Sequence, residues 1–125
     1  MCSSDLISDL NTTEYHTLAS LGVPMTVIGY NAKLLRDQSG NNLYYATNSI
    51  TLGGGESLDV ILDTCVVRPT TTVTTSTGAT VTVSVYTSCT TPMAVGTYYL
   101  YTPNLDHLSN DAENFGGQMT EVRVQ

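Results

Sequence analysis

The chain has 125 residues, enough for one domain with a hydrophobic core, and only 12% of them are charged. Eleven acidic against four basic residues give a formal net charge of −7, which disfavours nucleic acid and anionic membranes as partners. The sequence contains no run of about 18 apolar residues, so we expect no membrane span.

Two strands are predicted in the first third of the chain. Residues 15–21 alternate in polarity, with His16 and Leu18 on one side, and residues 25–30 are apolar enough to lie in the core. The polar segment 31–42 is predicted to be an exposed connection.

A triple glycine, Gly53 to Gly55, separates two further runs of β-type residues, 49–52 and 58–62. In the second run Leu58, Val60 and Leu62 share one face of a strand. Because glycine reaches positive φ without steric cost, we interpret the segment as a β-hairpin with a glycine corner. A phosphate-binding loop would need a following helix and usually a lysine, and the sequence provides neither.

The segment 65–92 is rich in threonine, with Val73, Val81 and other valines alternating with Thr and Ser. This pattern predicts a two-stranded hairpin, and a disordered Thr-rich loop is the alternative. Cys65 and Cys89 bracket the segment and are a candidate disulfide in an oxidising compartment.

Two more strands are predicted near the end, at 95–101 and 119–124, with a polar segment between them. The eight tyrosines, including Tyr98, Tyr99 and Tyr101, are predicted to be packing and interface residues. In total, seven to nine short strands and no helix predict an all-β, antiparallel sandwich.

The segments 96–101 and 116–124 resemble the end of a cupredoxin domain in a multicopper oxidase. Residues 51–63 and 16–29 are similar to earlier strand pairs of the same family. The resemblance covers most of the chain except 65–92, which looks like an inserted hairpin, and it is greatest to a copper-free middle domain.

This resemblance implies a single domain over residues 1–125, folded as a Greek-key sandwich of the cupredoxin (plastocyanin-like) type. Residues 6–11 look like a strand from within such a domain, so further strands are expected upstream. The family also implies an extracellular or periplasmic location, and copper as a cofactor of the parent enzyme.

Copper ligands of that family are His-x-His pairs and a Cys-His-Met type 1 set, because imidazole and thiolate set the geometry and potential of copper. Here His16 and His107 are the only histidines, and no His-x-His occurs. We therefore predict no catalytic residue and no resident cofactor in this chain, and inactivity on its own. His16 is interpreted as a packed histidine and His107 as a solvated one; if they meet in space, they can bind Cu(II) weakly.

Asp106, Asp111 and Glu113 place oxygen ligands in one polar segment. Calcium takes such ligands, although the spacing differs from the EF-hand loop. A plain acidic surface loop and a calcium-stabilised loop are both left open.

Two functions follow. The first is a non-catalytic domain that supports copper-bearing domains of an oxidase of phenolic or metal substrates, with other cupredoxin domains as partners. The second is a metal-free extracellular interaction module that assembles with copies of itself, in part through an unpaired strand edge.

Overall fold

The structure is a computed structural model that describes residues 6–84, 88–110 and 116–125. The described chain is all-β, with twelve strands and one short 3₁₀ helix, η1. The elements are β1 (His16–Leu21), β2 (Met25–Tyr30), β3 (Lys33–Leu34), β4 (Tyr45–Thr47), β5 (Ser49–Leu52), β6 (Leu58–Leu62), β7 (Cys65–Val67), β8 (Thr70–Thr74), β9 (Thr80–Ser84), β10 (Thr91–Pro92), β11 (Gly96–Tyr101), η1 (Leu105–His107) and β12 (Met119–Val124).

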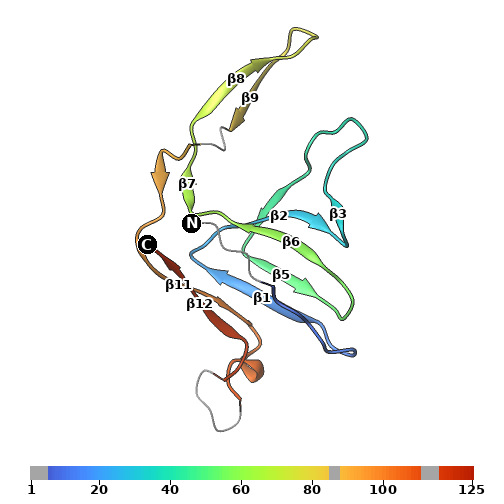
Figure 1. The fold of residues 1–125 in the computed structure, drawn as a ribbon, viewed down its shortest axis with the longest axis vertical. Coiled ribbons are helices and arrows are strands. Elements are labelled where there is room, and N and C mark those ends of the chain that lie inside the picture. The colour runs from blue at the N-terminus through green and yellow to red at the C-terminus, as the bar shows by residue number, and fades with distance from the viewer. Residues whose placement is uncertain (1–5, 85–87, 111–115) are drawn as a thin grey trace.

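Two antiparallel sheets form the body of the fold (Figure 1). The first has the order β12-β11-β1-β5. We call it the four-stranded sheet and name the second, which also has four strands, after its central strand β2. In the second, the β2 sheet, strand β6 pairs along one side of β2, and β3 and β4 pair with different parts of its other side. The result is a β-sandwich-like arrangement, as the sequence predicts at this level.

The core is centred on β2, because this strand has neighbours on both sides within its sheet. Met25 and Val27 are 1% and 0% exposed, and they are joined by Val23, Met93 and Leu100, all at 6% or less. These five are the buried apolar residues of the described chain. The prediction that residues 25–30 form a core strand is therefore confirmed.

Strand positions were predicted better than strand number. The expected strands at 15–21, 95–101 and 119–124 are present as β1, β11 and β12. The structure has twelve strands rather than seven to nine, because β3, β4, β7 and β10 have only two or three residues. Strands this short show no recognisable alternation in a sequence.

The glycine corner is not a hairpin, and that prediction is wrong. Strand β5 pairs with β1 in the four-stranded sheet, whereas β6 pairs with β2 in the other sheet. The corner therefore carries the chain from one sheet to the other. Gly55 has φ +85°, a conformation that favours glycine, and a Cβ on Gly54 would lie 2.3 Å from the carbonyl oxygen of Asn11.

Glu56 holds the corner in place, a role the sequence did not reveal. Its carboxylate accepts hydrogen bonds from the backbone N–H of Gly53 (2.9 Å) and from the hydroxyl of Tyr30 at the end of β2. The hydrogen bond from Tyr30 and that from Gly53 lower the pKa of Glu56 below its ordinary value. One carboxylate thus links the start of the crossover, at Gly53, to the end of β2 in the sheet that the chain enters.

The apolar run at the start of the described chain is not a strand, contrary to the expectation. Residues 6–10 have no regular secondary structure, and Leu6 and Leu10 are 93% and 89% exposed. Without a paired neighbour, a short apolar run has no ladder of hydrogen bonds to hold it extended.

The Thr-rich segment forms the predicted hairpin. Strands β8 and β9 pair from Thr70↔Ser84 to Thr74↔Thr80, and Gly78 at φ +81° completes the turn. The hairpin projects away from both sheets, and every residue of β8 is exposed (Figure 1). Residues 70–84 therefore form a paired hairpin and not the alternative, a disordered loop.

A disulfide and an ion pair fix the base of this hairpin. Cys65 and Cys89 are joined in a disulfide, with Cα atoms 5.7 Å apart, beside the short β7–β10 pair. Next to it, Nη2 and Nε of Arg68 donate to the two carboxylate oxygens of Asp63 at 2.6 and 3.1 Å. The N–H of Cys65 also donates to Asp63, at 2.9 Å.

This ion pair predicts a loss of stability in acid. Burial by itself raises the pKa of Asp63, but the hydrogen bonds from Arg68 and Cys65 and the charge of Arg68 outweigh it, so the pKa lies below its ordinary value. A lowered pKa stabilises the fold above the unfolded-state pKa of about 3.9, and that stabilisation is lost as the pH falls through the folded pKa. We expect Asp63→Asn to be less stable than wild type at neutral pH, and this difference to shrink below about pH 4.

Urea unfolding of both proteins across this pH range measures the effect. Asp59→Asn, which removes an exposed carboxylate on the neighbouring strand β6, is the matched control and should unfold like wild type at neutral pH. If Asp63→Asn were less stable than wild type by the same amount from pH 7 to pH 3, the lowered pKa of Asp63 would not be the cause of the loss.

Candidate functional site

The structure brings together the two histidines that lie far apart in the sequence. His16 opens β1 and His107 closes η1, and their ring centroids are 5.3 Å apart with the rings tilted by 45°. Nδ1 of His16 hydrogen-bonds with the amide of Gln118 at 2.9 Å, and Nδ1 of His107 lies 3.4 Å from the amide of Asn104. His107 and Gln118 thereby lie against the start of β1.

A third group, Asp9, approaches the histidines from the N-terminal segment. Its Oδ1 accepts the N–H of Asn11 at 2.9 Å and lies 3.9 Å from Nε2 of His16. Its Oδ2 is buried and has no hydrogen-bond partner among the described residues. Nothing in the sequence singled out Asp9, since its approach to His16 depends on the path of a segment without regular structure.

These contacts fit the interpretation of His16 as a packed histidine. Its side chain is 19% exposed, and both ring nitrogens face neighbouring amides, those of Gln118 and Asn11. Within the described part of the chain, no group of three or more His, Cys, Asp or Glu residues is placed to hold a metal ion. The cluster is therefore a pair of imidazoles with a carboxylate behind one of them, and binding of Cu(II) there stays a prediction.

The predicted calcium loop is described only in part. Asp106 is exposed in η1, and its N–H is capped by the side chain of Asn104 at 3.2 Å. Asp111 and Glu113 lie outside the described residues, so calcium binding at this segment stays a prediction.

The outward side of the four-stranded sheet carries an aromatic and apolar patch. Cross-strand partners point to the same face, so Tyr99 shares this face with its partners Leu21 and Glu121, and Tyr101 shares it with Met119. Leu21 is 60% exposed and Tyr99 is 36% exposed, in contrast to Leu100 on the inner face at 6%. We call Leu21, Tyr99, Tyr101 and Met119 the outer patch.

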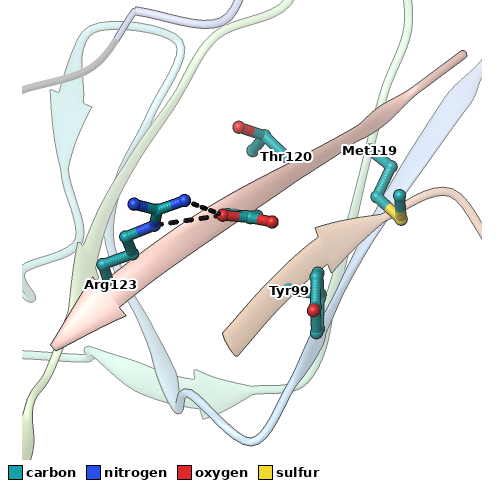
Figure 2. Close-up of a pocket in the computed structure, with 5 residues that line it drawn as sticks. Tyr99, Met119, Thr120 and Arg123 are labelled. Carbon is teal, nitrogen blue, oxygen red and sulfur yellow. Dashed lines mark hydrogen bonds and ion pairs between the residues drawn. The ribbon is translucent and has the colours of Figure 1, made fainter. Parts of the chain in front are cut away.

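A shallow hollow of about 740 Å³ extends from the outer patch to the edge of the sheet. It is lined by Tyr99, Met119, Thr120, Glu121 and Arg123 (Figure 2). Since residues alternate along a strand, Thr120 points to the opposite face from Glu121 and Arg123. The hollow thus reaches round the β12 edge of the sheet.

The rim of the hollow is charged. Nε and Nη2 of Arg123 donate to Oε2 of Glu121 at 3.1 and 2.8 Å along the same strand (Figure 2). Both side chains are exposed, at 70% and 46%, so the pair contributes little to folding. Nothing in the sequence marked Glu121 and Arg123 as part of a site, although their opposite charges two positions apart on a strand are visible there.

Comparison with known proteins identifies no relative. No family model, curated protein or solved structure matches the chain. None of the helical structure in the described residues is long and apolar enough to cross a membrane. The geometry of this chain is therefore the basis of its proposed function.

Proposed function

We propose that the chain is a non-catalytic β-sandwich module that works by packing against other protein, in the first place copies of itself. The observation that carries this proposal is the large surface that the chain leaves open. Its accessible area is 9343 Å², whereas a compact monomer of 13.4 kDa is expected to expose about 6,500 Å². A standard interface takes about 800 Å² from each partner, so the excess is enough for more than one.

The chemistry of the exposed surface supports this function. Interface centres are enriched in Tyr, Met and Arg and surrounded by a polar rim. The outer patch contains Tyr99, Tyr101 and Met119, and Arg123 and Glu121 lie at its border. Large exposed apolar side chains elsewhere, such as Val95 at 79%, extend the surface that a partner could cover.

Sedimentation velocity tests the proposal directly. We expect the purified, disulfide-bonded chain to sediment as a dimer or larger species at micromolar concentration and to dissociate on dilution. Its thermal unfolding midpoint should rise with concentration, because association stabilises the folded state by mass action. Sedimentation as a monomer with a concentration-independent midpoint would contradict the proposal.

The resemblance to multicopper oxidases supplies a second candidate, in which the same surface packs against copper-bearing cupredoxin domains. It is favoured by the antiparallel two-sheet arrangement, and the finer Greek-key cupredoxin assignment belongs to this candidate. The parent would then oxidise phenolic or metal substrates with its own copper. Coding sequence flanking this chain with His-x-His and Cys-His segments would support this candidate, and flanks without them would contradict it.

Both candidates place the protein outside the cytosol. The Cys65–Cys89 disulfide supports this, because such bonds persist in the periplasm and outside the cell and are rare in the reducing cytosol. An extracellular or periplasmic location is therefore part of the proposal.

A further inference from the structure

Strand β12 forms one outer edge of the four-stranded sheet. Its six residues pair with β11 in an uninterrupted register from Met119↔Tyr101 to Val124↔Gly96, and no strand of the described chain pairs with its other side. Proteins often blunt such an edge with proline, a bulge or a very short strand. Here the strand contains no proline, and its register shows no shift.

The hydrogen-bond pattern shows which backbone groups point outward from this edge. The N–H of Thr102 donates to the carbonyl of Gln118 at 2.9 Å, one step beyond the β11–β12 register. Hydrogen-bonded and non-bonded pairs alternate in an antiparallel ladder. The N–H and C=O groups of Thr120, Val122 and Val124 therefore point to β11. Those of Glu121 and Arg123 point to the open side.

A second copy of β12 fits this edge in one register. In an antiparallel pair, residues whose N–H and C=O groups point to the partner strand lie opposite one another. Residues of this kind in the second copy must therefore face Glu121 and Arg123. If Val122 meets Val122 of the second copy, Glu121 lies opposite Arg123 of that copy, and the two-fold axis repeats the pair. A shift in one direction would set Glu121 against Glu121, and a shift in the other would set Arg123 against Arg123, and like charges directly opposite are destabilising.

We propose that the chain forms a two-fold dimer by antiparallel pairing of β12 with β12 of a second copy, with Val122 on the axis and two Glu121–Arg123 pairs across it. This rests on the proposed self-association and specifies its surface and register. The dimer would contain one continuous eight-stranded sheet. Its outer patches would lie on the same face, because a two-fold axis perpendicular to a sheet preserves the face.

Charge reversal at the two positions tests the register. In Arg123→Glu, each copy presents two acidic residues, so like charges meet across the axis; in Glu121→Arg, two basic residues meet. We expect either variant alone to dissociate at least about tenfold more readily than wild type, since two attractive cross-strand pairs become repulsive. An equimolar mixture of the two should form a heterodimer, because every cross-strand pair is then attractive.

Analytical ultracentrifugation of each variant and of their mixture, with one chain fluorescently labelled, gives the readout. Lys33→Glu, on the exposed strand β3, changes the net charge as Arg123→Glu does and should leave association unchanged. Circular dichroism verifies that each variant is folded, which is expected because both side chains are exposed.

The outcomes separate this inference from the proposed function. If wild type self-associates and each variant self-associates equally well, the β12 register is wrong and the proposed function stands. Variants that dissociate but do not associate with each other when mixed would also overturn it. Wild type that stays monomeric would contradict the proposed function and the β12 dimer together.

Discussion

Replacing Met25 with alanine is expected to lower the free energy of unfolding by about 3 kcal/mol. Met25 is 1% exposed and pairs with Thr47 of β4 on one side and Leu62 of β6 on the other. Backbone ladders hold β4 and β6 at a fixed spacing from β2, so these strands cannot collapse fully into the space left behind. Because few residues are buried, this one side chain carries a large share of a net stability of about 5–15 kcal/mol.

Urea unfolding followed by tyrosine fluorescence measures this loss, since the chain has eight tyrosines and no tryptophan. Leu34→Ala is the matched control: it removes a side chain of similar size that is 51% exposed on β3. We expect it to cost well under 1 kcal/mol, as is usual for surface positions. A larger loss for Leu34→Ala than for Met25→Ala would show that the core is not centred on β2.

Loss of the Cys65–Cys89 disulfide should have a comparable effect. The bond closes a loop with a sequence separation of 24, and the restriction it places on the unfolded chain is expected to contribute about 3 kcal/mol. We expect the double variant Cys65→Ala/Cys89→Ala to unfold at a correspondingly lower urea concentration than the oxidised wild type. The double variant avoids the free thiol that a single replacement would leave.

Reduction provides an independent control for this prediction. Treatment with dithiothreitol should lower the stability of wild type to about that of the double variant and should leave the variant unchanged. Equal midpoints for oxidised wild type and the double variant would mean that the hairpin base is held by other contacts, foremost the ion pair of Asp63 and Arg68.

The sequence was most informative where alternation is long and local. The faces of β6 and the strand β12 followed from period-two patterns, and the core position of β2 followed from its dense apolar residues. The hairpin at 70–84 followed from valines alternating with threonine around a glycine turn. The disulfide candidate was also visible, because both cysteines flank that hairpin. These features depend on residues close to one another in the chain.

Pairing between distant segments could not be read in the same way. The runs on either side of Gly53–Gly55 look like partners because they are adjacent, yet β5 pairs with β1 and β6 with β2. Alternation shows which face a side chain takes but does not identify the neighbouring strand. For the same reason, the approach of His16 to His107 and the outward-pointing backbone of Glu121 emerged only from the three-dimensional structure.

The projecting hairpin has a consequence for proteolysis. Its exposed turn between β8 and β9 is a natural site of cleavage, and a cut there would separate a piece with β1 and β5 from a piece with β11 and β12. These four strands belong to one sheet, and Cys65 and Cys89 lie on different pieces. A nicked molecule would therefore remain one folded, covalently linked unit and would separate into two fragments only when denatured and reduced.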